Sequence, residues 1–568
     1  MRGSRDLFSY GVSVTESNRL ESGHASFKVP TLLFTGIFTT YILTLSNSHF
    51  ADALSAASQV QYPGPPISGN HILFPFVPTL LHRALVHFGW TGSTLLTVQV
   101  FNALCGAIAV TMMYLVSLTI TRNTRVSLWI AIGFGFSAGV WIYSVDAKNA
   151  VMPLAFGLFY LYILLQNRYP NRTYTPLILS SICVVAIAIY ETGVFLVAVT
   201  AIGFLLNPAL NRRDRVKQLV IFTASTIFLT ASVLLSVAHV FCGVNSLHDF
   251  INWEFAYSRL ELWGKPSLKK TIRGLSSMLK SITFYPGFNV NRRVWFAGAS
   301  VPQRIASFVI FGAAMLALAV LITETIRCRS IIMHRYLWES SMVATWAVLN
   351  GLFSLYWTQT DLSFSIPVLA SGWILVGILI SARSDSASVT QNSGMAARAT
   401  DLLAFSVVAI TIVNLGAVYN NLKPDCPYRI AQAIGESTTS DDLIIDSGAD
   451  PALSVAIPYF AHRKTISVFL WFLGSLGPPS NPWVIPDPRP RDARYGLRRG
   501  KQYVFEGIDR VANETRARGG RVFSIGAYRG QDDQWSDPHV VGFTEQDFSR
   551  FQGRRVWTVC GEDLLEIR

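Results

Sequence analysis

The stretch Ser46-Asn47-Ser48-His49-Phe50-Ala51-Asp52-Ala53-Leu54 places a carboxylate just after the first apolar span of the chain. A Pro/Gly-rich run follows at 62–66, and behind it lies Asn70-His71-Ile72-Leu73-Phe74-Pro75, an apolar segment that contains a histidine. An ionisable side chain at a membrane edge is costly beside lipid, and such groups are usually functional. The stretch therefore indicates a membrane enzyme with Asp52 in its site.

Composition identifies the class of protein. Of 568 residues, 51% are hydrophobic and only 14% are charged, whereas soluble domains carry about 25% charged residues. The formal net charge of +13 would also fit a nucleic-acid partner. We reject that partner because much of the excess lies in short loops between apolar spans, where basic residues set membrane topology.

Ten apolar stretches are long enough for membrane helices, at roughly 20 residues per crossing: 29–47, 93–119, 125–144, 149–166, 176–206, 217–241, 303–324, 339–357, 363–381 and 401–419. The stretch 176–206 is too long for one simple crossing and carries Glu191 in its middle. A hairpin of two short helices would put Glu191 at the outer tip and the basic run 212–217 in the cytoplasm. Because basic residues favour the cytoplasmic side, we expect this hairpin and about eleven spans in total.

This topology divides the chain into three parts. Residues 1–28 form a cytoplasmic N-terminal tail, 29–419 a transmembrane domain, and 420–568 an extracytoplasmic domain. The transmembrane domain has a first outer loop at 48–92 and a long outer loop at 242–302. The expected fold is thus an α-helical polytopic membrane protein with a small C-terminal α/β domain, in the plasma (inner) membrane if the source is bacterial. Four acidic residues fall at the outer face: Asp52, Asp146, Glu191 and Asp361.

The topology suggests its own test. Cysteines introduced at Ser58 and Ser440 should react with an impermeant thiol reagent in intact cells, and one at Ser386 should not.

The C-terminal part alternates helix and strand patterns. The run 442–448 is typical of a buried strand that ends in a turn, and 521–525 follows a helical stretch in the same way. Alternation of this kind indicates an α/β domain. Cys426 and Cys560 lie near its two ends. They would bridge only in an oxidising compartment, and the sequence leaves that pairing open.

From Tyr41 to Ile120 the chain resembles the GT-C superfamily of polytopic glycosyltransferases, particularly its protein O-mannosyltransferase-like members. The resemblance rests on the order of several short motifs along the first two-thirds of the chain. Three motifs lie in the first part of the chain: 41–45 at the end of the first span, 50–54 with its helical continuation, and 71–75 after the proline-rich break. Three more follow: Val145-Asp146, the hairpin motif 186–193, and Leu355-Tyr356-Trp357 before Asp361. One departure concerns the first loop, where many family members carry two adjacent acidic residues but Asp52 is followed by Ala53.

The resemblance implies a membrane glycosyltransferase that moves a sugar from a polyprenyl-phosphate carrier to an extracytoplasmic acceptor, which could be protein, glycan or lipid. It implies a hexosyltransferase of inverting type. An attacking hydroxyl needs a base within hydrogen-bond distance, and we expect Asp52 to be that base, with Asp146 as a second catalytic candidate. Expected substrate-binding residues are His71, Lys148, Glu191, Arg259 and Lys265; the cations among them would bind the lipid phosphate.

Each of these residues also has a structural interpretation. Asp52 could cap the helix that follows it, and Asp146 could be a solvated loop residue. Glu191 could pair with a nearby cation, and His71 could be an interfacial side chain. Lys148, Arg259 and Lys265 could contact lipid headgroups or water, and Asp361 could be a loop residue at a helix end.

Two other functions remain open at this point, a membrane transporter or lipid flippase and a non-catalytic envelope assembly factor. Transporters often contain inverted repeats with paired broken helices, and no internal repeat is evident in this sequence. An assembly factor would tolerate loss of Asp52 but not of 420–568. No metal-ligand spacing is present and no cofactor is implied with certainty, although a divalent metal could take part if Asp146 lies beside Asp52.

Overall fold

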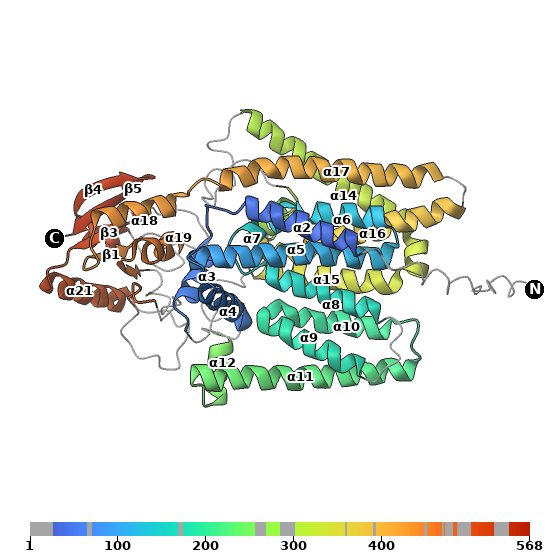
Figure 1. The fold of residues 1–568 in the computed structure, drawn as a ribbon, viewed down its shortest axis with the longest axis horizontal. Coiled ribbons are helices and arrows are strands. Elements are labelled where there is room, and N and C mark those ends of the chain that lie inside the picture. Colours follow the sequence, from blue (N-terminus) through green and yellow to red (C-terminus); the bar gives the residue numbers. More distant parts are fainter. Residues whose placement is uncertain are drawn as a thin grey trace, which may run out of the picture.

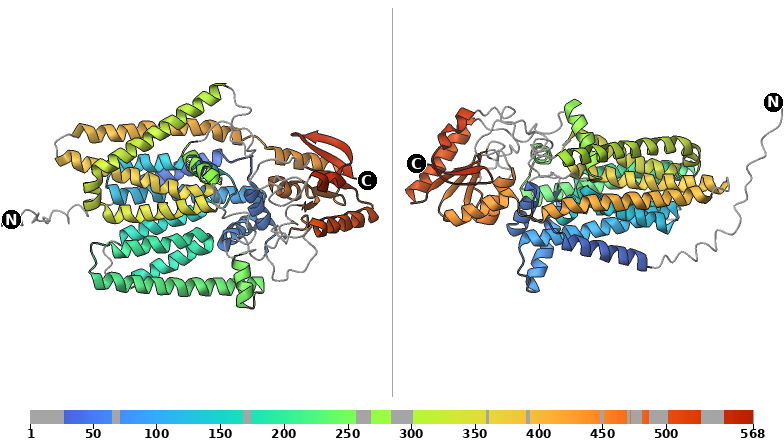
Figure 2. Two further views of the ribbon diagram at one scale, coloured as in Figure 1. Left: turned by 180° about the vertical axis from the view of Figure 1, so that it is seen from behind. Right: turned by 90° about the horizontal axis from the view of Figure 1, so that it is seen from above.

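The computed structural model describes residues 27–64, 71–167, 174–255, 268–283, 301–357, 361–389, 393–447, 451–468, 471, 481–485, 501–526 and 545–567. Most of the helices run roughly parallel in one body, and a small sheet domain lies at one end of it (Figure 1). Both further views place that domain beyond one end of the helical body (Figure 2).

The helical body is built around α5 (Thr94–Thr121), which packs against α2, α6, α7 and α8. Ser93 caps α5 by accepting a hydrogen bond from the backbone N–H of Leu96. The other long elements of the body are α2 (Lys28–Leu43), α6 (Thr124–Gly135), α7 (Ala138–Val145), α8 (Val151–Gln166), α9 (Thr175–Ile189), α10 (Phe195–Leu205), α11 (Arg212–Cys242), α14 (Val301–Arg335), α15 (Leu337–Tyr356), α16 (Ile366–Val389) and α17 (Ser393–Asn421).

Short helices lie at the end of the body that faces the sheet domain (Figure 1). They are α3 (Ala51–Gln61), α4 (Leu73–His87), α12 (Leu247–Glu254) and α13 (Leu268–Lys280). The face of α4 that carries Phe76 and Leu80 is exposed, as expected for a helix that meets lipid.

The chain is an integral membrane protein by the length and composition of its helices. Among the described residues, α5, α11 and the segments 362–385 and 398–416 are long and apolar enough to cross a membrane singly, and α6 and α7 form a pair bent by 60°. The helices α2, α8 and α9 are apolar but shorter. Each predicted stretch corresponds to a helix or to a pair of helices, while the count of eleven spans and the domain boundaries remain predictions.

The hairpin expected in 176–206 is present. Helix α9 ends at Ile189, the 3-10 turn η3 (Glu191–Val194) follows, and α10 returns from Phe195. The turn requires glycine at position 193, because a Cβ there would lie 2.5 Å from the carbonyl carbon of Ala186. Glu191 therefore lies at the tip of the hairpin.

The C-terminal domain has a five-stranded sheet in the described residues, with the order β2-β1-β3-β5-β4. Parallel pairing joins β1 (Leu443–Asp446) to β2 (Lys464–Ser467) and to β3 (Val522–Ile525), and Leu443 is in register with Lys464 and Val522. The strands β4 (Arg554–Val559) and β5 (Glu562–Ile567) form an antiparallel pair beside β3.

Helices cover both faces of this sheet, as expected for an α/β domain. Ile444 packs among residues of α18 (Cys426–Ser437) and α19 (Pro451–Ala456). Its neighbours in the strand, Leu443 and Ile445, pack instead against α21 (Lys501–Ala517). The alternation follows from the two-residue repeat of a strand.

A disulfide between Cys426 and Cys560 joins the start of α18 to the β4–β5 turn, with Cα atoms 5.8 Å apart. The pairing that the sequence left open is therefore made in this structure.

The α/β domain is docked on the start of α5 and on α3. The Tyr459 hydroxyl accepts a hydrogen bond from the N–H of Leu95 at 3.0 Å and lies 2.9 Å from the Thr94 hydroxyl. The Asn481 amide donates to the Ser58 hydroxyl at 3.0 Å. Ser58 is consequently buried, so it is a poor site for a topology probe because no reagent would reach it.

We expect labelling of introduced cysteines to report the orientation of this domain. Ser440 is exposed next to β1, and Ser384 is exposed near the opposite end of the helical body, on α16. In a Cys242→Ser background, Ser440→Cys should react with an impermeant maleimide in intact cells, and Ser384→Cys only after permeabilisation. Labelling of Ser384→Cys in intact cells would contradict the orientation.

Candidate functional site

The centre of the candidate site is the ammonium group of Lys148. Lys148 lies in the loop between α7 and α8, with its side chain 6% exposed. Its Nζ lies 2.6 Å from an oxygen of Asp361 and 3.1 Å from an oxygen of Asp52. Burial lowers the pKa of Lys148, but the attraction of the two carboxylates outweighs burial and the pKa is well above its ordinary value. The group is therefore a fixed positive charge at neutral pH.

Asp361 is the firmly held partner of this cation. Its Oδ1 accepts hydrogen bonds from the N–H of Ser363 at 2.9 Å and from the Ser363 hydroxyl at 2.7 Å. The Tyr143 hydroxyl donates to the same oxygen at 3.2 Å. Burial raises the pKa of Asp361, and Lys148 and Ser363 lower it by more, so the net shift is downward. Asp361 thus stays ionised beside Lys148.

Asp52 is the exposed partner. It lies in the first turn of α3, its side chain is 65% exposed, and Lys148 is its ion-pair partner among the described residues. The N-cap of α3 is Phe50, and no side chain caps the helix there. Asp52 is therefore not a helix cap, and its position leaves one face open to an incoming group. The contact between the Asp52 carboxylate and the buried Lys148 was not predicted from the sequence.

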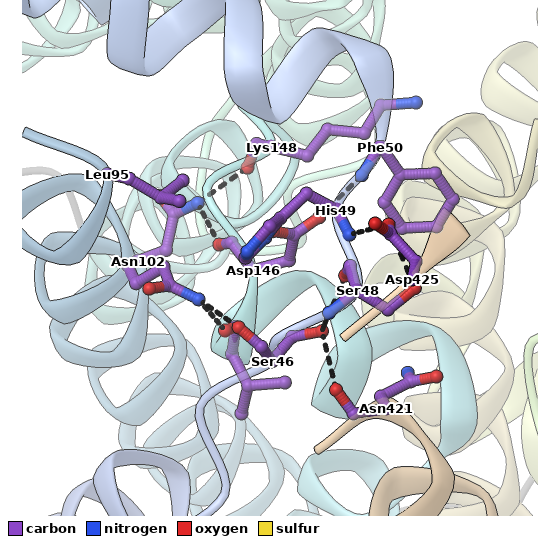
Figure 3. A network of polar contacts seen from close by, with 12 residues as sticks. Ser46, Ser48, His49, Phe50, Leu95, Asn102, Asp146, Lys148, Asn421 and Asp425 are labelled. Carbon is purple, nitrogen blue, oxygen red and sulfur yellow. Dashed lines mark hydrogen bonds and ion pairs between the residues drawn. The ribbon is translucent and has the colours of Figure 1, made fainter. Parts of the chain in front are cut away.

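Asp146 has a different environment from the one expected for a catalytic group. It is 1% exposed, and its two oxygens contact His49 Nδ1 at 2.9 Å and the N–H of Phe50 at 3.2 Å (Figure 3). Both oxygens are thus used to hold the residues just before α3. In the described structure Asp146 holds the segment that directly precedes α3, the helix that carries Asp52.

A groove begins next to the charged cluster. Asn149 and Ala150, which directly follow Lys148, line it, and so do Ser363 and Phe364, two and three positions after Asp361. It contains about 610 Å³ of free space, part of which is open to solvent. The other lining residues are mostly apolar or small and come from α8, the α9–α10 hairpin, α15 and α16: Pro153, Leu154, Gly157, Ala186, Tyr190, Thr192, Gly193, Leu196, Trp346, Asn350 and Pro367.

Glu191 and His71 lie together beside this groove. Their closest polar atoms, His71 Nδ1 and Glu191 Oε2, are 3.9 Å apart, and both side chains are about one-third exposed, at 32% and 28%. The His71 ring packs against Tyr190 with centroids 4.6 Å apart, and Tyr190 lines the groove. The structure thus brings these two predicted residues together next to Tyr190.

Two predicted phosphate-binding residues, Arg259 and Lys265, lie outside the described residues. Asp361 was predicted to lie at the outer face but was not predicted to be a site residue. Two features of the sequence could have identified Asp361 as a site residue. It follows the aromatic motif 355–357, and the predicted topology puts it on the same side of the membrane as Asp52. Nothing in that pattern indicated contact with Lys148, which is 213 positions away in sequence.

The cluster of Asp52, Lys148 and Asp361 carries a formal charge of −1, from two carboxylates and one ammonium. No group of three His, Cys, Asp or Glu side chains is arranged to hold a metal ion within the part of the chain that the structure describes. Lys148 occupies the position between Asp52 and Asp361 that a bridging cation would need. These residues therefore do not fit a metal held by Asp52 and Asp361 together.

We expect Lys148→Met to destabilise the protein by about 3–5 kcal/mol, because it leaves the carboxylate of Asp361 largely buried without its cation. Lys148→Met combined with Asp361→Asn should recover part of that loss, since the two effects are coupled. Unfolding in detergent, followed for both single variants and the double variant, measures the coupling. Strictly additive losses would show that the pair does not act as a unit.

Comparison with solved structures identifies the fold. The crystal structure of ArnT from Cupriavidus metallidurans bound to undecaprenyl phosphate matches with a TM-score of 0.52 at 10% identity, over 95% of this chain and 98% of that chain. ArnT in the apo state gives a TM-score of 0.42 at 12% identity, with the same coverage. AglB from Archaeoglobus fulgidus, in complex with an inhibitory peptide and a dolichol-phosphate, gives 0.48 at 11% identity, over 78% of this chain and 65% of that one.

No protein-family model and no curated protein matches the sequence. The chain shares the fold of ArnT, and this likeness supports the GT-C-type fold that the sequence motifs indicated.

Proposed function

We propose that this protein is a membrane glycosyltransferase that moves a sugar from a polyprenyl-phosphate carrier to an extracytoplasmic acceptor. The observation that carries the proposal is the buried ammonium of Lys148, which lies between an exposed carboxylate and the groove-lining residues Asn149 and Ala150. The undecaprenyl phosphate bound to ArnT, a protein of the same fold, supports a lipid phosphate as the ligand. Mannosyltransferase-like specificity belongs to this proposal only as an expectation from the sequence motifs.

Lys148 would bind the phosphate of the donor. Asp361 is fixed by Ser363 and Tyr143, whereas Asp52 is 65% exposed. An incoming phosphate would therefore take the place of Asp52 on Lys148 and leave Asp361 where it is. A charge-assisted contact of this kind stabilises the negative charge that develops on a leaving phosphate.

Asp52 would then be the general base. The acceptor oxygen forms a bond to the anomeric carbon as its proton passes to the Asp52 carboxylate. The bond between that carbon and the phosphate oxygen breaks, and its electron pair leaves with the polyprenyl phosphate beside Lys148. A single displacement of this type inverts the configuration of the anomeric carbon.

The groove would hold the part of the donor next to the phosphate. Tyr190, Leu196 and Trp346 offer apolar surface, and Asn350 and Thr192 add polar groups. A mostly apolar cleft with a few polar groups is typical of a small-molecule site. His71 and Glu191, next to Tyr190, would bind sugar hydroxyls, and Arg259 and Lys265 remain proposed phosphate ligands.

Turnover of labelled polyprenyl-phosphate sugars in detergent tests the proposal. We expect wild type to consume at least one donor in a panel, and Asp52→Asn to lower the rate by about 10²–10⁴, as for loss of a general base. Asp441→Asn is the matched control, because Asp441 is an exposed carboxylate of the α/β domain.

A rate for Asp52→Asn equal to that of wild type would remove Asp52 from the mechanism. No consumption of any donor by folded wild-type protein would favour a transporter or an assembly factor instead.

A further inference from the structure

Five residues that precede α3, 46–50, form a strap between the helical body and the α/β domain; we call them the first-loop strap. The N–H of Ser46 donates to the carbonyl of Val145 at 3.0 Å, and the N–H of Asn47 donates to the carbonyl of Asn421 at 2.8 Å. The Asn47 amide also donates to the carbonyl of Leu422 at 2.8 Å. The strap is thus bound on one side to the end of α7 and on the other to the end of α17 (Figure 3).

Asp425 holds the strap from the α/β domain. Its Oδ1 accepts a hydrogen bond from the N–H of Tyr428 at 3.0 Å and so caps α18. Its Oδ2 accepts a hydrogen bond from the N–H of His49 at 2.9 Å and lies 3.4 Å from the Ser48 hydroxyl. One carboxylate therefore fixes both the first helix of the domain and the strap.

Asp146 holds the strap from the helical body, through the His49 ring and the N–H of Phe50. Phe50 is the N-cap of α3, two residues before Asp52. The loop of Asp146 is itself fixed by Asn102, whose amide donates to the carbonyls of Asp146 at 2.8 Å and Lys148 at 2.7 Å. The same short loop thus positions Lys148 and, through Asp146, the start of α3.

From this arrangement we infer that the α/β domain positions the catalytic base through Asp425. The inference rests on the proposed function, because it takes Asp52 as the base. Asp425 and Asp146 act as positioning residues: they contact the strap, and the strap fixes the first turn of α3 and hence Asp52 relative to Lys148. A misplacement of about 1 Å in a reacting group can lower a rate by about a hundredfold.

The variant Asp425→Ser should keep the hydrogen bond to the N–H of Tyr428 and remove the one to the N–H of His49. Serine is a good N-cap, so its hydroxyl can still accept from Tyr428. Its single short oxygen cannot also reach the N–H of His49. Asn481→Ala is the matched control, because it removes a hydrogen bond between the same domain and α3, at Ser58, without touching the strap.

Hydrogen–deuterium exchange is the first measurement, and it needs no substrate. In Asp425→Ser we expect faster exchange at His49, Ala53 and Leu54, with Tyr428 still protected. In Asn481→Ala we expect these amides to exchange as in wild type. Unchanged exchange at Ala53 and Leu54 in Asp425→Ser would overturn the inference, and so would an equal acceleration in Asn481→Ala.

Kinetics is the second measurement. We expect Asp425→Ser to lower kcat by about ten- to a hundredfold while the KM for the donor stays within about twofold, because the donor phosphate still binds Lys148 but the base is misplaced. An unchanged kcat, or an equal loss in Asn481→Ala, contradicts the inference. If wild type consumes no donor, the proposed function fails, and the exchange at Ala53 and Leu54 alone decides whether the domain positions α3.

Discussion

A single buried ammonium group constrains the end of the helical body that faces the α/β domain. Removing a charge from water is unfavourable unless partners compensate it, and Lys148 has its two carboxylate partners in segments far away in the sequence. The α7–α8 loop, the start of α3 and the segment before α16 must therefore meet at one point. The groove between α8, the hairpin and α16 begins near that meeting, since Asn149 follows Lys148 and Ser363 lies two positions after Asp361.

Polar side chains within the central helix make this arrangement rigid. Gln99 and Asn102 of α5 are buried, and their amides donate to main-chain carbonyls of the strap and of the Lys148 loop. Buried amides without partners would be destabilising, so each one fixes the loop that it contacts. The α/β domain adds a second set of contacts, through Asp425 and Tyr459. The backbone that precedes Asp52 is thus hydrogen-bonded to both the helical body and the α/β domain.

The sequence predicted the helical class, the hairpin with Glu191 at its tip, the α/β character of the C-terminal part and the place of Lys148 in a loop between apolar spans. These features follow from local patterns such as apolar length, loop charge and helix–strand alternation. It did not predict that Asp361 would bind Lys148, that Asp146 would be buried against His49, or that Ser58 would lie under Asn481. Each of these contacts joins residues that are distant in sequence, so it depends on packing that no local pattern reports.

The position of the donor phosphate is the most direct test of the role given to Lys148. A cryo-electron microscopy structure of the wild-type protein with a bound polyprenyl phosphate would measure it. We expect the phosphate to contact Lys148 Nζ at the mouth of the groove, with Asp52 moved off the cation and Asp361 still in contact. A phosphate bound elsewhere, with both carboxylates still on Lys148, would contradict the proposed site.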